Sequence, residues 1–241
     1  MKKQNKQSEI KTFDEITSGK GYSKPLDQDY NNLLMYLFSD IEINNDMRLL
    51  DVGCGSGEHS IKLSKLNFKI TGVDISSKAI KSAKENVKQT KLKNLDFCVC
   101  DIENLCFDDN TFDICFCGAV LHHFPDIEKV AKELSRVTKI KGKLLAYDPN
   151  AHHPYTFMAH NILNRFVQLE GFSSNERALK PKDIQIPFKK AGFSNFKFNS
   201  FVLSTSKSER NVIRNLSYII INKMYFGLGK GNILTSICEK I

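Results

Sequence analysis

The sequence predicts an α/β fold in which an open, mostly parallel sheet is covered by helices on both faces. Short apolar runs alternate with amphipathic helical stretches through residues 48–147, which is the pattern of a doubly wound sheet. A glycine-rich turn follows the first run, and an aspartate ends each of the first three runs. The 241 residues are enough for one such domain with additional helices.

The first 45 residues are predicted to form a helical cap or lid ahead of the core. Residues 1–11 are polar and lysine-rich and predict a frayed end, whereas residues 12–45 have helical character. An apolar stripe at helical spacing is formed by Tyr30, Leu33, Leu34, Leu37 and Phe38. If this cap closes over the sheet edge, Tyr22 in a Gly-Tyr-Ser-Lys-Pro loop would cover a bound ligand.

Residues 46–241 are predicted to hold the core, and its strands are short runs rich in β-branched and aromatic residues. In order they are Arg48–Val52, Phe68–Val73, Leu95–Cys100, Phe112–Gly118, Leu144–Tyr147, Phe196–Leu203 and Ile233–Glu239. The fifth strand begins after Gly142, and Gly231 precedes the last strand. Chain segments long enough for helices separate these runs.

The helices of the core are predicted from apolar spacing and from capping residues. Ser76 or Ser77 can cap the second helix, and Gly192 closes the helix before the sixth strand. The predicted helices are 58–66, 77–90, 127–138, 153–169, 182–191 and 210–226. The helices at 153–169 and 210–226 make the predicted helical insertions near residues 150–180 and 205–228.

Composition argues for a cytoplasmic protein and against nucleic acid as a partner. The net charge is +8, but it comes mostly from lysines spread along the chain, whereas phosphate-binding surfaces favour clustered arginines. No run of 18 apolar residues predicts a transmembrane helix. The seven cysteines form no C-x-x-C pair and predict free thiols in a reducing compartment. No zinc site is expected.

The most informative segment is the glycine-rich turn after the first strand. Residues 49–60 read Leu-Leu-Asp-Val-Gly-Cys-Gly-Ser-Gly-Glu-His-Ser, with alternate glycines that allow a sharp turn and close approach of a ligand to backbone N–H groups. This segment resembles the first motif of class I S-adenosylmethionine-dependent methyltransferases. The resemblance implies that the acid lies near the methionine ammonium and the turn near its carboxylate. The implied cofactor contacts are Asp51, Gly53, Cys54, Gly55 and Gly57.

Two further acids follow the second and third strands, and ligands of open α/β sheets bind outside such strand ends. Asp74 lies about 20 residues after the glycine turn, as expected for a ribose-binding carboxylate, and Ile75 can cover an adenine face. Asp101 matches the family position that accepts from the adenine amino group, with Ile102 supplying a backbone amide and an apolar wall. Taken singly, each acid could also be a turn residue.

The resemblance covers residues 49–148 and implies a Rossmann-like, seven-stranded sheet whose last strand is antiparallel. It implies further cofactor contacts at the end of the fourth strand, from Cys117 and Gly118, and from Leu121 with His122 beside the sulfonium. The implied cofactor is S-adenosylmethionine, which leaves as S-adenosylhomocysteine. The motifs are specific for this cofactor and carry little information about the acceptor.

Two histidine doublets follow the fourth and fifth strands. His122 and His123 are the candidate general bases, with His123 preferred, because histidine titrates near neutral pH; a structural role is the alternative. His152, His153 and Tyr155 are candidate acceptor contacts, although a turn into a helix would also explain them. No metal is expected, since no carboxylate stands at helical ligand spacing to either doublet.

The sequence therefore predicts methyl transfer to a small-molecule acceptor, at a hydroxyl oxygen or an amine. The Asn-Pro-Pro-Tyr motif of base-modifying methyltransferases is absent after the fourth strand, where Gly-Ala-Val-Leu-His-His stands. The alternatives are a nucleic-acid-directed or noncatalytic module of the same fold, and a nicotinamide dehydrogenase, which the glycine spacing and Asp101 disfavour. The 210–226 helix could pack internally, form a homodimer surface, cap the acceptor or touch a membrane.

Overall fold

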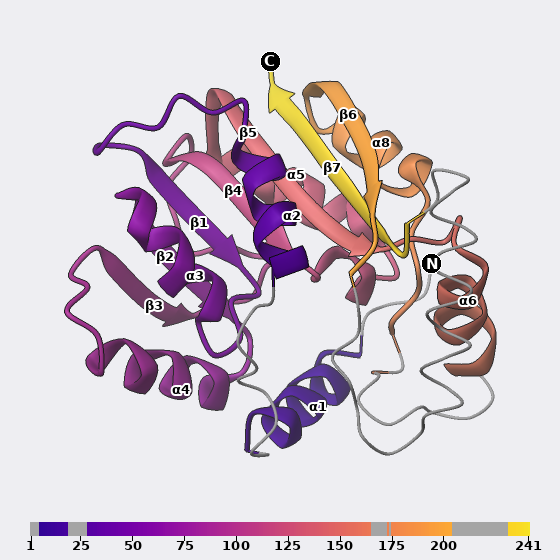
Figure 1. Cartoon of the computed structure of the whole chain (residues 1–241), viewed down its shortest axis with the longest axis horizontal. Helices are drawn as coiled ribbons and strands as arrows, with labels where there is room; N and C mark the ends of the chain where they lie inside the picture. Colours follow the sequence, from indigo (N-terminus) through magenta and orange to yellow (C-terminus); the bar gives the residue numbers. More distant parts are fainter. Residues whose placement is uncertain (1–4, 19–27, 165–172, 174, 204–230) are drawn as a thin grey trace.

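Seven strands form a single sheet with the order β3-β2-β1-β4-β5-β7-β6 (Figure 1). The computed structural model describes residues 5–18, 28–164, 173, 175–203 and 231–241. The strands are β1 (Arg48–Val52), β2 (Lys69–Asp74), β3 (Leu95–Val99), β4 (Phe112–Gly118), β5 (Thr138–Pro149), β6 (Phe193–Phe201) and β7 (Ile233–Lys240). The predicted seven-stranded α/β sheet is confirmed.

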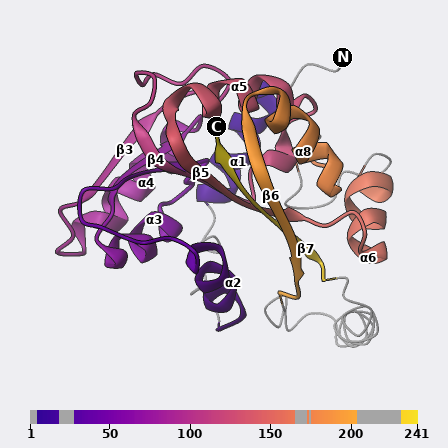
Figure 2. The ribbon, with the colours of Figure 1, turned by 90° about the horizontal axis from the view of Figure 1, so that it is seen from above.

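Helices cover both faces of this sheet, as the view from above shows (Figure 2). The α-helices are α1 (Lys6–Ser18), α2 (Gln28–Phe38), α3 (Glu58–Leu63), α4 (Ser77–Lys88), α5 (Ile127–Val137), α6 (Pro154–Phe157) and α8 (Pro181–Lys190). Two short 3-10 turns are η1 (Ser64–Leu66) and η2 (Leu121–His123), and a π-helical turn, η3, spans Met158–Leu163. One apolar cluster joins the sheet to α5 and α8, and a second joins its other face to α2, α3 and α4.

Strand β1 lies at the topological switch point, because it pairs in parallel with β2 on one side and with β4 on the other. Helix α3, which follows β1, packs on one face of the sheet, and α5, which follows β4, packs on the other. A crevice therefore opens at the carboxyl ends of these strands. At the other end of the sheet, β7 lies between β5 and β6 and is antiparallel to both. The predicted antiparallel last strand is confirmed.

The N-terminal segment differs from its prediction. Helix α1 already begins at Lys6, within the stretch predicted to fray, and α2 ends at Phe38, so residues 39–47 are not helical. Tertiary contacts explain the first difference: the Glu9 side chain is buried and Lys6 forms ion pairs, so a polar sequence is held in place by partners far along the chain. In Figure 1, α1 lies beside α4, below the arrowhead of β1.

Other strand and helix boundaries differ from the predicted ones by a few residues. Strand β5 is longer than predicted because its pairing with β4 continues through a register shift to Thr138, and β6 begins at Phe193 rather than Phe196. The predicted 153–169 helix is seen as α6 and η3. Tyr22, residues 165–169 of that helix and the 210–226 helix lie outside the described residues. Within the described part of the chain, every helix is too short or too polar to cross a bilayer.

Candidate functional site

A cavity of about 230 Å³ opens at the carboxyl ends of the strands, between the sheet and α1. Seven of the residues that the sequence assigned to the site line it: Gly53, Cys54, Asp74, Ile75, Ile102, Gly118 and His123. They come from the ends of β1, β2 and β4, from the loop after β3, and from η2. The predicted sheet edge therefore forms part of the cavity wall.

The glycine turn adopts a backbone that other residues would strain. Gly53, Gly55 and Gly57 have φ values of +68°, +53° and +81°, in the left-handed region that glycine enters without steric cost. A Cβ on Gly53 would lie 2.5 Å from Cγ2 of Val120, and one on Gly57 would lie 2.9 Å from Cζ of Phe97. The turn is therefore packed closely against neighbouring side chains. Two of its residues, Gly53 and Cys54, line the cavity.

Two buried aspartates support this turn. Asp74 accepts backbone N–H bonds from Gly55 at 3.0 Å and from Ser76 at 2.9 Å, while Asp51 accepts the Ser60 hydroxyl at 2.5 Å. Burial raises the pKa of Asp74, an effect that these N–H donors oppose. Burial raises the pKa of Asp51 to about 7, and the Ser60 bond opposes it. Asp74 lines the cavity and can therefore gain from a cationic or hydroxyl-bearing ligand, whereas Asp51 lies behind the turn.

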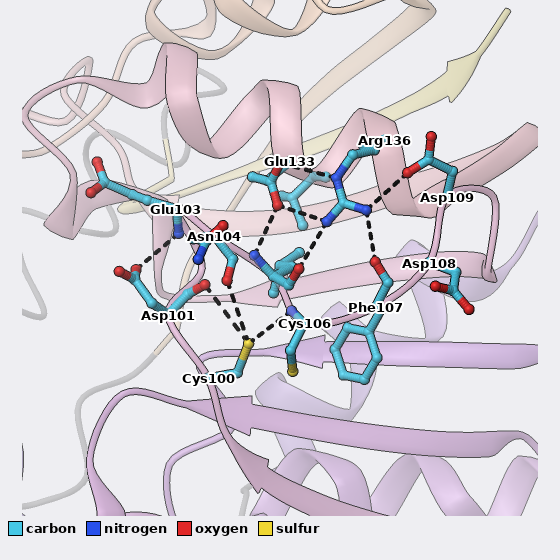
Figure 3. A network of polar contacts seen from close by, with 12 residues as sticks. Cys100, Asp101, Glu103, Asn104, Cys106, Phe107, Asp108, Asp109, Glu133 and Arg136 are labelled. Atoms are coloured by element: carbon cyan, nitrogen blue, oxygen red, sulfur yellow. Dashed lines mark hydrogen bonds and ion pairs between the residues drawn. The ribbon is translucent and has the colours of Figure 1, made fainter.

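The loop that carries Asp101 is fixed by Arg136 of α5 (Figure 3). Its guanidinium donates to the carbonyl oxygens of Phe107 at 2.7 Å and Leu105 at 2.8 Å, and to the carboxylates of Glu133 and Asp109. Glu133 in turn accepts the N–H of Leu105 at 2.8 Å. This bidentate network holds the loop after β3 against α5, and so sets the position of the residues at its start.

Helix α1 crosses the opening and binds to the rim on both sides. Lys6 forms ion pairs with Asp101 at 2.5 Å and Glu103 at 2.7 Å. Asp14 accepts from the Ser76 hydroxyl at 2.5 Å and lies 3.5 Å from Nζ of Lys78. Between these anchors, Glu9 and Phe13 line the cavity. Neither was identified from the sequence, because both lie in a segment with no motif.

The His122 side chain is held by Asp148 at the end of β5. Asp148 Oδ1 accepts the backbone N–H of His122 at 3.0 Å and lies 2.9 Å from its Nδ1. Burial raises the pKa of Asp148 to about 8 and lowers that of His122, so burial drives both groups toward their uncharged forms. His122 does not line the cavity; it packs behind His123, with ring centroids 4.1 Å apart.

His123 lies among carboxylates. Its Nδ1 is 3.3 Å from Glu9 Oε2 and 3.7 Å from Glu176 Oε1, and the Phe13 ring meets it edge-on at 5.2 Å. Burial lowers the pKa of His123, but the contact with Glu9 and the charge of Glu176 outweigh burial and raise it. The pKa of His123 is therefore raised while that of its neighbour His122 is lowered, and of the two only His123 lines the cavity.

A second polar group of the cavity was missed by sequence reasoning. His59 at the start of α3 and Tyr147 on β5 line the wall; their Nε2 and hydroxyl lie 3.0 Å apart, and the Tyr30 hydroxyl contacts both. Burial lowers the pKa of His59 to about 4, so the ring is neutral at pH 7. His59 directly follows the motif glycines, which is the one signal that could have pointed to it.

The remaining predicted residues lie behind or outside the cavity wall. Asp51, Gly55, Gly57, Asp101, Cys117 and Leu121 support lining residues without lining the cavity themselves. His152 is exposed and Tyr155 is half-buried. His153 is buried and caps α6, accepting from the N–H of Thr156. Direct acceptor contact by these last three residues stays a prediction.

Metal ligation was not expected from the sequence. Among the described residues, His122, His123 and Glu176 bring potential donor atoms within 4.8 Å of one another. The hydrogen bonds and ion pairs within this cluster already include Asp148 and Glu9 as partners. The carboxylate comes from a distant segment, so no local spacing rule could have detected the cluster.

The residues present fit S-adenosylmethionine, the cofactor implied by the motifs. Gly53 lines the cavity at a position where a Cβ would meet Val120, and Asp74 presents a buried carboxylate to the cavity beside Ile75 and Ile102. A carboxylate accepts from paired ribose hydroxyls, and flat apolar walls suit an adenine. The role of Asp51 at the ammonium stays a prediction, because its carboxylate lies behind the turn and does not line the cavity.

Comparison with known proteins agrees with this assignment. Ubiquinone biosynthesis O-methyltransferase of Coxiella burnetii is 37% identical over 124 residues, which cover 52% of each chain. Sterol 4-C-methyltransferase strm-1 of Caenorhabditis elegans is 27% identical over 124 residues, 51% of this chain and 37% of that protein. The chain thus matches about half or less of the length of these curated relatives.

Solved structures share the fold at low sequence identity. The YcgJ protein of Bacillus subtilis superposes with a TM-score of 0.64 at 21% identity, covering 88% of this chain and 98% of that one. Phosphoethanolamine N-methyltransferase 2 of Haemonchus contortus, solved with S-adenosyl-L-methionine, gives 0.67 at 19% identity over 96% of this chain and 56% of that one. Residues 43–192 match the family described as a methyltransferase domain, so the chain belongs to the class I S-adenosylmethionine-dependent methyltransferases.

Proposed function

We propose that this protein transfers a methyl group from S-adenosylmethionine to the oxygen or nitrogen of a small molecule. The observation that carries the proposal is the placement of His123 in the wall of a cavity that is also lined by Gly53 of the glycine turn and by Asp74. The cofactor supplies a methyl group on a sulfonium, whose departure leaves a neutral thioether. The protein then needs chiefly to hold the acceptor at the right distance and alignment.

The shape of the site favours a small acceptor. Helix α1 crosses the opening, and its side chains Glu9 and Phe13 form part of the wall. A cavity of about 230 Å³ with this helix over its opening suits a small acceptor better than a polymer. The names of the relatives, an O-methyltransferase and a C-methyltransferase among them, are compatible with a small acceptor and do not select its atom.

The chemistry of His123 favours an acceptor that loses a proton. An imidazole near a hydroxyl or amine can accept that proton as the acceptor becomes nucleophilic. We also propose a cytoplasmic location, which the seven unbridged cysteines support. A homodimer through the 210–226 helix stays a prediction, because that helix lies outside the described residues.

The experiment is an acceptor screen with the full chain and S-adenosylmethionine, read by mass spectrometry as a gain of one methylene. We expect product from at least one class of phenols, alcohols or amines, and none with Asp74→Ala. Transfer to RNA, DNA or protein in place of every small acceptor would contradict the proposal, as would the absence of S-adenosylhomocysteine formation from all classes.

A further inference from the structure

Helix α1 carries one carboxylate, Glu9, that contacts the ring of His123. The Oε2 atom of Glu9 lies 3.3 Å from His123 Nδ1, and both side chains are buried. This contact exists only where α1 docks on the rim through Lys6 and Asp14. The environment of His123 is therefore completed by the helix that also closes the cavity.

The Glu9 carboxylate is oriented by two hydrogen-bond donors from a segment that is distant in the sequence. Its Oε1 accepts from the Ser173 hydroxyl at 2.7 Å and from the Asn175 amide at 2.7 Å. Burying a carboxylate costs free energy unless its oxygens have partners. The two bonds to Oε1 leave the other oxygen, Oε2, facing His123. Burial raises the pKa of Glu9, but the His123 and donor contacts outweigh burial and lower it, so Glu9 is ionised.

We propose that Glu9 is a positioning residue that makes His123 an effective base when α1 is docked. The inference rests on the proposed function and concerns proton transfer alone. The O–H or N–H bond of the acceptor breaks, its electron pair remains on the acceptor, and the proton forms an N–H bond on the imidazole. Glu9 orients the ring and balances the positive charge that the imidazole then carries.

The surroundings of His123 are dominated by Glu9 and Glu176. Titratable groups face it from β2, η2, β5, η3, α1 and the segment before α8: Asp74, His122, Asp148, His160, Glu9 and Glu176. The charge of Arg177 acts on His122 and Asp148. Burial lowers the pKa values of His122 and His160, so these rings are neutral near pH 7. Of the two nearest carboxylates, Glu9 is the closer to Nδ1.

The test is an NMR titration of the histidine side chains of the full chain bound to S-adenosylhomocysteine, with His123→Gln used to assign the signal. Glu9→Gln should lower the pKa of His123 and move the acidic limb of the kcat–pH profile to lower pH. Glu103→Gln is the matched control, because it also removes a rim carboxylate that binds α1, through Lys6, without contacting His123. It should leave the His123 titration unchanged.

Asn175→Ala provides a second variant if Glu9→Gln unfolds, because it removes a donor to Glu9 and leaves His123 untouched. It should shift the His123 titration in the same direction by a smaller amount. An unchanged titration in both variants, or an equal shift in Glu103→Gln, would overturn the proposal. So would binding of one zinc ion per wild-type chain that is lost in Glu176→Gln, since His122, His123 and Glu176 would then form a metal site. The titration needs no acceptor, so its outcome is separate from the acceptor screen.

Discussion

The backbone N–H of Gly55 donates to Oδ2 of Asp74 at 3.0 Å, and this bond joins the glycine turn to the end of β2. The second oxygen of Asp74 accepts from the N–H of Ser76 at the start of α4. The carboxylate is therefore fixed before any ligand binds, while its remaining lone pairs face the cavity. Such preorganisation lowers the entropic cost of binding a ribose.

Replacement of Asp74 by Asn should weaken S-adenosylhomocysteine binding by about tenfold to a hundredfold, since bonds to a charged acceptor contribute about 1.5–3 kcal/mol. The amide oxygen of Asn can still accept from the Gly55 N–H. Its NH2 group then points either at the Ser76 N–H, which is itself a donor, or at the ribose hydroxyls. Titration calorimetry measures the loss. Asp96→Asn, an exposed acid on the neighbouring strand β3, is the control and should bind as the wild type does. Equal affinity of both variants would contradict the ribose role of Asp74.

Tyr147→Phe should distinguish the two ends of the cofactor. In the sheet order Tyr147 lies three strands away from β2, so its hydroxyl and His59 are placed for the aminoacyl end rather than for the adenosine. We expect the variant to bind S-adenosylhomocysteine about tenfold more weakly and 5′-methylthioadenosine, which lacks the aminoacyl group, with unchanged affinity. Tyr36→Phe is the control outside the cavity wall. Equal losses for both ligands would refute the placement.

Binding of S-adenosylhomocysteine should depend on pH through Asp51. Its pKa is raised to about 7 by burial, so the carboxyl is largely protonated below that pH, and the ligand ammonium favours the ionised form. Affinity should therefore rise as the pH increases toward 7 and level off above it. Asp51→Asn should weaken binding and flatten this dependence. Because the Ser60 bond lowers the pKa, Ser60→Ala should move the midpoint to higher pH. A midpoint unaffected by either variant would exclude Asp51 as the titrating group.

The sequence was sufficient for the parts of the site that follow local rules. Alternate glycines require a left-handed backbone and acids at strand ends meet at one edge, so Gly53 and Asp74 were found from spacing alone. Glu9 could not be found in this way. Its partners Ser173 and Asn175 lie 164 and 166 residues away, and its own segment is polar and lysine-rich. The burial of such a residue is a tertiary property that neither periodicity nor composition encodes.

The same argument applies to Tyr147, whose neighbours Tyr30 and His59 come from α2 and α3. In the sequence, Tyr147 has the pattern of an ordinary core residue of a strand. In the structure its ring belongs to the apolar cluster that joins the sheet to α2, α3 and α4. Only the three-dimensional meeting of three polar side chains marks it as part of the cavity wall. His153 shows the opposite case, because one member of a suggestive histidine doublet has a structural role as the cap of α6.

Arg136→Lys should destabilise the protein although it keeps the charge. The guanidinium bridges two carbonyl oxygens and two carboxylates at once, a geometry that one ammonium cannot reproduce. Loss of one or two of these bonds should lower the free energy of unfolding by about 1–3 kcal/mol, measured by urea denaturation. Arg48→Lys is the control, because its cation contacts the Phe112 ring in a way that lysine can also achieve. Since the loop held by Arg136 carries Asp101 and Ile102, cofactor affinity should fall in Arg136→Lys and not in Arg48→Lys. Equal stability of the two variants would show that the Arg136 network contributes no more than its charge.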